Sequence, residues 1–177
     1  MGLPKRLDSK QFPLVVRWNA RDGKMHRVDR KQDDVGNWAT DLIDITKDFE
    51  AVMGMKNIEV GFIDFTSRPP DFRMVRLGGE VGECPGDNFK EGFRLRMRLL
   101  NGAGNDVREF SSTSKYVWQS LSELHDEYLE ERVKHKDKLP VAGIAEVVQV
   151  RTTSSTFYRP IFEFLRWVKC PELTGGK

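Results

Sequence analysis

The sequence predicts a mainly β protein with one long helix. Two segments, residues 57–65 and 91–100, alternate apolar with polar side chains, which is the pattern of strands with one buried face. Between residues 117 and 128, large apolar side chains recur instead at helical spacing. From residue 57 onward the predicted order is strand, loop, strand, strand, helix, strand, strand, which is the order of the five-stranded OB barrel. We therefore expect an OB-like barrel with an N-terminal extension. An α+β sandwich is the alternative, because element order alone does not fix closure of a barrel.

Prolines and glycines separate the first predicted strands. The strand at residues 57–65 ends at Arg68-Pro69-Pro70-Asp71, and the stretch from there to Asn88 is predicted to be a loop, within which residues 72–77 are a candidate for a short strand. Four glycines and a proline between residues 78 and 88 then predict a loop. After the strand at 91–100, turn-forming residues lead into the returning arm of a hairpin at residues 107–110.

The predicted helix has clear start and stop signals. Residues 111–114 are all serine or threonine, which cap helices well. A helix of about 20 residues should follow, and it should end before Leu139-Pro140. Two strands, at residues 144–152 and 157–168, complete the chain, because both segments are rich in β-branched or aromatic side chains.

These elements suggest a division of the chain into three parts. Residues 1–55 are rich in charged residues and contain one strand-like run at residues 14–18, so we expect an extension that packs on the core. Residues 56–171 should form the OB-like domain. Residues 172–177 should form a flexible tail.

Composition excludes several classes of protein. The 177 residues include 29 Lys plus Arg and 27 Asp plus Glu, so the net charge is only +2. No apolar run approaches the roughly 20 residues of a membrane-spanning helix. The charged N-terminus lacks the apolar segment of a signal peptide, so we expect a cytoplasmic location. The two cysteines, Cys84 and Cys170, are too few for a disulfide framework or a zinc site.

The sequence contains no recognisable catalytic motif, and we expect neither an enzyme nor a bound metal or cofactor. The three histidines have unrelated surroundings, and none has the spacing of a pair of metal ligands. The glycine-rich segment 78–82 lacks the Gly-Lys-Ser/Thr ending of a phosphate-binding loop. A small hydrolase that uses Glu80 and Glu83 of the glycine-rich loop is kept as a third possibility.

The strongest functional signal is a row of arginines in the strand at 91–100. Arg94, Arg96 and Arg98 share one face of that strand at a spacing of about 7 Å, comparable to successive phosphates in an extended single strand. Residues 90–113 and 140–169 together contain nine basic residues against five acidic ones. Such a local excess on a nearly neutral protein indicates an anionic partner. The alternative is a solvated sheet face without a ligand, and the hypothesis requires that carboxylates leave the three guanidinium groups available.

Aromatic side chains lie among these charges. Single-strand binders combine a basic groove with rings on which bases stack. Phe110 shares a face with Arg108 and Tyr158 adjoins Arg159, so we expect both rings to be exposed. The predicted nucleic-acid-binding residues are Arg94, Arg96, Arg98, Arg108, Phe110, Arg151, Tyr158 and Arg159.

Three stretches, residues 91–98, 108–115 and 157–168, resemble uncharacterised phage and prophage proteins related to single-stranded DNA-binding proteins. The resemblance covers roughly residues 90–170. It implies an OB fold, a phage or bacterial origin, and a role in DNA replication or recombination. Many such proteins end in an acidic tail that recruits partners, whereas this sequence ends in Leu173-Thr174-Gly175-Gly176-Lys177.

These observations together predict a protein that binds single-stranded nucleic acid with low sequence selectivity. Single-stranded DNA is the expected ligand, and RNA is left open. The alternative is a structural or assembly protein, such as a virion or replisome component, that uses the same face to bind an acidic protein. Edge strands of a partly open barrel can pair, so a homo-oligomer is also left open.

Overall fold

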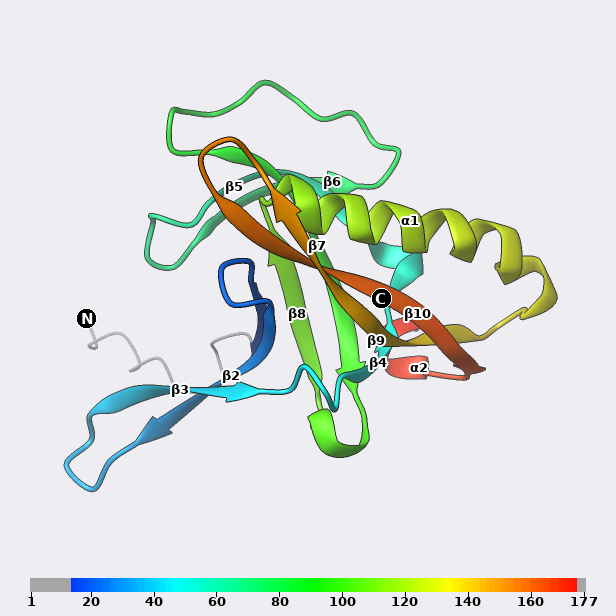
Figure 1. Ribbon diagram of the computed structural model, residues 1–177, viewed down its shortest axis with the longest axis horizontal. Coiled ribbons are helices and arrows are strands. Elements are labelled where there is room, and N and C mark those ends of the chain that lie inside the picture. The colour runs from blue at the N-terminus through cyan, green and yellow to red at the C-terminus, as the bar shows by residue number, and fades with distance from the viewer. Residues whose placement is uncertain (1–13, 175–177) are drawn as a thin grey trace, which may run out of the picture.

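The computed structural model describes residues 14–174, and it confirms the prediction of a mainly β protein with one long helix. A single sheet curls into a half-barrel, and helix α1 (Lys115–Glu131) packs across one face of it (Figure 1). The sheet has ten strands, so the prediction of five is wrong in number. The strands are β1 (Val15–Asn19), β2 (Lys24–Gln32), β3 (Trp38–Asp44), β4 (Glu50–Met53), β5 (Glu59–Asp64), β6 (Asp71–Arg76), β7 (Lys90–Leu99), β8 (Val107–Ser112), β9 (Leu139–Arg151) and β10 (Thr156–Val168).

Strand β7 is the centre of the sheet. Neighbouring strands follow the order β10-β9-β4-β7-β8-β1-β2-β3, and β5 and β6 branch from β7. Strands β4 and β5 pair with different parts of β7, at residues 97–99 and 90–94 respectively, and β8 pairs along its other edge. All pairs are antiparallel except β1 with β8. The side chains of β7 therefore decide what both faces of the sheet carry at its centre.

The segment that we expected to form an N-terminal extension supplies strands β1 to β4 of this sheet. Strand β4 lies between β7 and β9. Its residues Ala51, Val52 and Met53 are at most 2% exposed, and they pack into two different apolar clusters. A strand that is covered on both faces reads as a continuous apolar run. The alternation on which the sequence prediction depended could therefore not reveal β4.

Strand β7 alternates strictly between the core and the opposite face. Phe93, Leu95, Met97 and Leu99 are all at most 1% exposed. They pack with the apolar side of α1 in the main hydrophobic core. Burial of four large apolar side chains is worth several kcal/mol, and a shift of register by one residue would turn all four outward. The same constraint holds the intervening arginines on the solvent side.

Helix α1 follows the sequence signals closely. The Ser114 side chain caps it by accepting a hydrogen bond from the Val117 backbone N–H. Val117, Leu121, Leu124 and Tyr128 are all buried, as their spacing predicts. The helix has 17 residues and continues as a 3-10 turn, Arg132–Lys134, before β9 begins at Leu139.

The tip of the β9–β10 hairpin reaches back to the turn between β1 and β2. The backbone N–H of Tyr158 donates to the Ala20 carbonyl at 2.7 Å, and the Trp18 indole N–H donates to the Tyr158 carbonyl at 3.0 Å. Gly23 makes this approach possible, because its φ is +67° and a Cβ atom there would lie 3.0 Å from the Tyr158 ring. These contacts, which we call the closing contact, join β10, at one end of the strand order, to the β1–β2 turn.

The C-terminal end of the described chain is partly buried. Cys170 and Leu173, at the short helix α2 (Pro171–Thr174), pack on Val52 and Val141 in a second apolar cluster. Leu173 is only 4% exposed, so it is not part of a flexible tail, which corrects that expectation. The remainder of the predicted tail, residues 175–177, lies outside the described residues.

We expect Gly23→Ala to destabilise the protein by about 2–4 kcal/mol. The left-handed backbone costs about 1–2 kcal/mol for a residue with a Cβ atom, and overpacking against Tyr158 costs about 1–3 kcal/mol more. Chemical denaturation measures the free energy of unfolding. The matched control is Gly78→Ala, since Gly78 has a φ of +92° but a Cβ atom there would have no neighbour within 4 Å. Equal losses for the two variants would contradict the closing role of the Gly23–Tyr158 contact.

Candidate nucleic-acid interface

Arg94, Arg96 and Arg98 do emerge on one face of the sheet, opposite the core. Arg96 is exposed and the other two are half-buried. Registers between strands bring further arginines to the same face. Arg76 of β6 and Arg94 of β7 both lie directly opposite Glu59 of β5. We call the surface formed by Arg17, Arg76, Arg94 and Arg96 the outer sheet face.

The spacing of these groups follows from sheet geometry. Arg76 and Arg94 are two strands apart, which is about 10 Å, and Arg94 and Arg96 are about 7 Å apart along β7. Arg17 is an exposed residue of β1, and it alternates with the core residues Val16 and Trp18. The outer sheet face therefore spans β6, β5, β7, β8 and β1.

Carboxylates compensate two of the three predicted arginines, which corrects the expectation of an uninterrupted basic row. The Arg94 Nε donates to Glu59 at 3.0 Å. The Arg98 Nη1 donates to both oxygens of Glu172, at 2.7 and 2.8 Å. Arg96 lies opposite Glu109 in the sheet register but forms no ion pair within residues 14–174. The two compensating acids come from β5 and α2, so inspection of β7 alone could not find them.

The pair of Arg94 and Glu59 uses only one nitrogen of the guanidinium group, and the Arg94 side chain is 23% exposed. Only Nε donates to the carboxylate, and the two terminal nitrogens have no acceptor among the described residues. Partly exposed ion pairs of this kind are worth about 0–1 kcal/mol. Arg98 is more fully engaged, since its Nη2 also contacts Asn105 at 3.4 Å.

Two phenylalanines that were not among the predicted site residues border the outer sheet face. The Arg94 guanidinium lies 4.4 Å from the centre of the Phe72 ring. Phe65 packs edge-on against Phe72 at 6.2 Å and is 47% exposed. Both residues flank the turn between β5 and β6. Alternation within each strand could not reveal them, because their approach to Arg94 depends on how β6, β5 and β7 pair.

The predicted aromatic residue Phe110 is buried, which corrects the expectation of an exposed ring. It is 0% exposed and packs edge-on against Phe93 at 5.5 Å. It lies opposite Leu95, on the core face of β7. The prediction relied on Phe110 sharing a face with Arg108, and it failed because Arg108 is itself buried.

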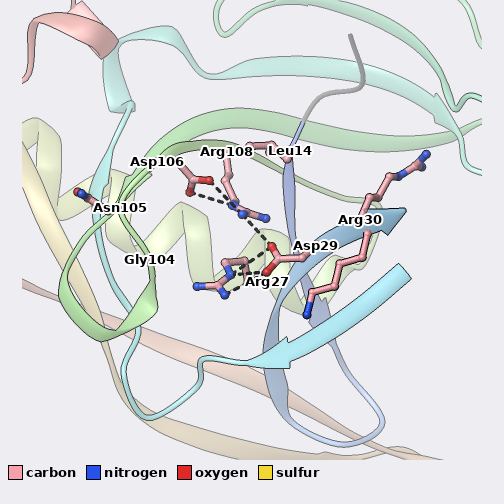
Figure 2. A pocket seen from close by; sticks show the side chains of 9 residues that line it. Leu14, Arg27, Asp29, Arg30, Gly104, Asn105, Asp106 and Arg108 are labelled. Carbon is pink, nitrogen blue, oxygen red and sulfur yellow. Dashed lines mark hydrogen bonds and ion pairs between the residues drawn. The ribbon is translucent and has the colours of Figure 1, made fainter. Parts of the chain in front are cut away.

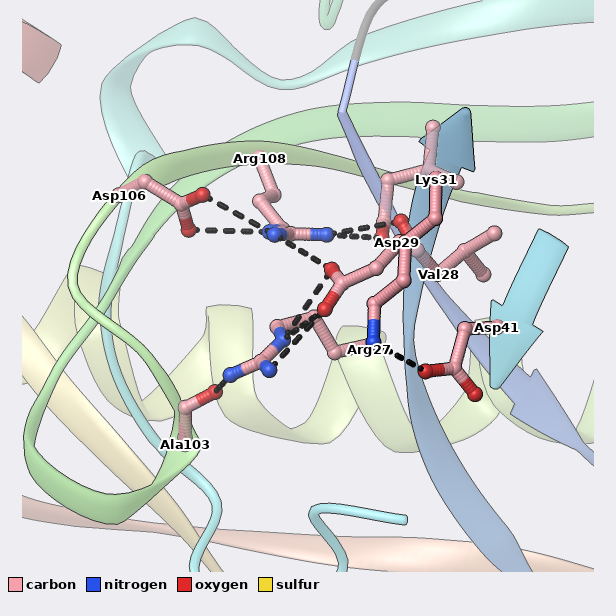
Figure 3. Close-up of polar contacts among 9 residues, drawn as sticks. Arg27, Val28, Asp29, Lys31, Asp41, Ala103, Asp106 and Arg108 are labelled. Atoms are coloured by element: carbon pink, nitrogen blue, oxygen red, sulfur yellow. Dashed lines mark hydrogen bonds and ion pairs between the residues drawn. The ribbon is translucent and has the colours of Figure 1, made fainter. Parts of the chain in front are cut away.

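Arg108 lies at the floor of a cavity of about 330 Å³ between β2 and the β7–β8 turn (Figure 2). The residue is only 5% exposed. Its Nε donates to Asp106 at 2.9 Å and its Nη2 contacts Asp29 at 2.9 Å, while Nη1 donates to the Val28 carbonyl at 2.9 Å (Figure 3). These contacts join β8 to β2. Arg108 is therefore a structural residue and is not available to a phosphate.

Asp29 is shared between two arginines in this cluster. It accepts hydrogen bonds from the Arg27 Nε and forms the ion pair with Arg108 (Figure 3). Partial burial would by itself raise the pKa of Asp29, but hydrogen bonds and charge from Arg27 and Arg108 outweigh burial and lower it. Arg27 also donates to the Ala103 carbonyl at 3.0 Å. The carboxylate thus holds two strands and the β7–β8 turn together.

The remaining predicted residues lie around the β9–β10 hairpin. Tyr158 is half-buried against the core and belongs to the closing contact described above. Arg159 is engaged by Glu123 at 3.1 Å and by Ser120 at 3.3 Å, both on α1. Arg151 is exposed near the hairpin tip and forms no ion pair with residues 14–174. Only Arg96 and Arg151 of the eight predicted residues are thus both exposed and without an ion pair in the described chain.

No group of three or more His, Cys, Asp or Glu residues within 14–174 is arranged to hold a metal ion. Glu80 and Glu83 of the glycine-rich loop are exposed. None of the helices in the described part of the chain is long and apolar enough to cross a membrane. Comparison of the chain with protein-family models, curated proteins and solved structures found no match.

We expect Asp29→Asn to destabilise the protein by about 2–4 kcal/mol at pH 7, because it leaves Arg108 with less compensation in a buried position. A lowered carboxyl pKa contributes stability that is present above its unfolded value of about 3.9 and is lost as pH falls through the folded pKa. The difference between wild type and variant should therefore shrink below about pH 4. Denaturation curves at pH 7 and at lower pH measure this.

Asp41→Asn is the matched control. The pair of Asp41 with Lys31, at 3.3 Å, is largely exposed, so its removal should change the free energy of unfolding by less than about 1 kcal/mol. A difference between wild type and Asp29→Asn that stays constant from pH 7 to acidic pH would refute the role of the Asp29 carboxylate.

Proposed function

We propose that the protein binds single-stranded nucleic acid on the outer sheet face, with low sequence selectivity. The observation that carries this proposal is the exposed guanidinium of Arg96 beside the Phe72-stacked Arg94. The neighbouring Arg76 and Arg17 extend the positive surface on both sides. Arginine donates in a planar fork that suits phosphate oxygens. No arrangement of base-reading groups is needed for such binding.

The strand order supports the interpretation of the half-barrel as an OB-like fold. Strands β4, β7, β8, β9 and β10 lie side by side in the order β10-β9-β4-β7-β8, and α1 follows β8 along the chain. We take these as the five OB strands, with β1 inserted beside β8 and the β5–β6 arm inserted before β7. In OB folds the second and third strands carry the ligand face. Here those strands are β7 and β8, and Arg94 and Arg96 lie on β7.

The aromatic pair supplies the second part of a single-strand site. Phe65 and Phe72 stand beside Arg94, so a strand whose phosphates contact the arginines would place bases near these rings. Base stacking on an aromatic side chain contributes about 1–3 kcal/mol per base. The resemblance of residues 90–170 to phage proteins favours DNA over RNA and a role in phage or bacterial replication or recombination.

A structural or assembly role is the second candidate, and the β2–β3 hairpin favours it. The hairpin projects from the barrel (Figure 1), and β3 ends the strand order of the sheet. Trp38 and Leu42 of β3 are 48% and 51% exposed. Single-stranded DNA should displace an acidic protein from the outer sheet face but should not displace a partner bound at β3. A competition experiment therefore distinguishes these two binding sites for an assembly partner.

Replacing Arg76, Arg94 and Arg96 together by Gln should flatten the salt dependence of binding. Each single-strand phosphate contact contributes about −0.7 to the slope of log K against log salt, so the slope should fall in magnitude by about 2. Fluorescence anisotropy of a labelled oligothymidylate at several salt concentrations measures this. The control removes three charges elsewhere, as Arg21→Gln, Lys47→Gln and Lys56→Gln. Absence of wild-type binding at low salt would overturn the proposal.

Phe65→Leu should weaken binding of the same oligothymidylate by about 1–3 kcal/mol while leaving the salt slope unchanged, because it removes a stacking surface and no charge. Trp38→Leu is the matched control, since Trp38 has nearly the same exposure on a different strand. Equal effects of the two variants would remove Phe65 from the interface.

A further inference from the structure

The connection between α1 and β9 carries a second concentration of positive charge. Within residues 132–138 there are four cations, Arg132, Lys134, Lys136 and Lys138, and all are exposed. Asp137 is the only acid in that segment. We call these four cations, together with Lys169, the basic turn.

Lys169 joins the group through the sheet register. Val168 of β10 lies opposite Leu139 of β9, so the next residue, Lys169, lies alongside Lys138. Lys169 is also exposed. The basic turn thus combines two segments that are about 30 residues apart in the sequence.

Local helix electrostatics explains only part of this cluster. Cations in the last turn of a helix interact favourably with its negative pole, but the effect falls off within that turn. Arg132 and Lys134 lie close enough to α1 for this role, and Lys134 also pairs with Glu131 at 3.6 Å. Lys136, Lys138 and Lys169 lie beyond the helix and form no ion pair in the part of the chain that the structure describes.

Aromatic packing holds the basic turn in place. The His135 ring stacks on Trp167 with centroids 4.5 Å apart and planes 7° apart. Trp167 in turn lies nearly parallel to the buried Tyr128, at 5.9 Å. The backbone at Asp137 adopts a φ of +62°, which completes the tight return into β9. A fixed turn presents its lysines with a smaller loss of conformational entropy on binding.

We propose that the basic turn is a second contact for the phosphate backbone of single-stranded nucleic acid. This inference rests on the proposed function of the outer sheet face. The protein has a net charge of only +2, so attraction of a polyanion depends on local groups of cations rather than on overall charge. Half-exposed rings, here His135 and Trp167, beside exposed cations are the combination that single-strand binders use. A strand long enough to reach from the outer sheet face to the far end of α1 contacts both surfaces.

The test compares four proteins on one probe: the wild type, a basic-turn variant, the Arg76, Arg94 and Arg96 variant, and a control variant. The probe is a labelled oligothymidylate of about 30 nucleotides, which exceeds the usual site size of one OB fold. Lys134→Gln, Lys136→Gln and Lys138→Gln together should reduce the magnitude of the salt slope by about 2 and the affinity at low salt at least tenfold. The control variant is the Arg21, Lys47 and Lys56 triple described above, which removes the same charge from other elements. Circular dichroism establishes that each variant is folded.

The outcomes distinguish this inference from the proposed function. If the basic-turn variant binds with the same slope and affinity as the control variant, the basic turn is not a contact. The outer sheet face then stands if the Arg76, Arg94 and Arg96 variant still loses slope. If the wild-type protein fails to bind the probe at low salt, both the proposed function and the second contact are overturned.

Discussion

The structure depends on the alternation of one central strand. Strand β7 pairs with β4, β5 and β8, and its four large apolar residues must all enter the core beneath α1. This requirement fixes the register of the sheet, because a slip by one residue would expose all four. It also fixes the direction of Arg94, Arg96 and Arg98. Core packing of β7 thus orients two of the four arginines of the outer sheet face, Arg94 and Arg96, and a ligand would meet groups that are already in position.

The buried arginine Arg108 has more hydrogen-bonding and ion-pair partners than the arginines on the outer sheet face. Arg108 sits at 5% exposure, where its guanidinium is surrounded by Asp29, Asp106 and backbone carbonyls. A buried cation without such partners would be strongly destabilising. On the outer sheet face, by contrast, Arg94 has a single carboxylate contact and Arg96 has no ion pair with any described residue. The same residue type therefore stabilises the fold at one site and remains available to a ligand at the other.

The sequence predicted correctly those features that depend on residues within a single strand or helix. The alternation of β7, the spacing of Val117, Leu121 and Leu124, and the Ser114 cap all lie within one element, and the structure has each of them. Errors arose where the answer depends on pairing between distant segments. Alternation cannot reveal strand β4, because both of its faces are buried. Nor does any pattern within β8 show that Arg108 and Phe110 both face the interior, where they lie opposite the buried residues Met97 and Leu95. Glu59, Glu172 and Phe72 approach β7 only through the tertiary fold.

Two groups of cations, those of the outer sheet face and those of the basic turn, lie on a chain that is nearly neutral overall. Under the proposed function, β7 presents arginines directly to a nucleic-acid strand. The most direct measurement is a titration of isotope-labelled protein with oligothymidylate, followed by NMR of backbone amides and arginine side chains. We predict that the largest shifts occur at Arg94, Arg96 and the neighbouring Phe72. Shifts that leave β7 unchanged and cluster on another part of the molecule, such as β3, would contradict it.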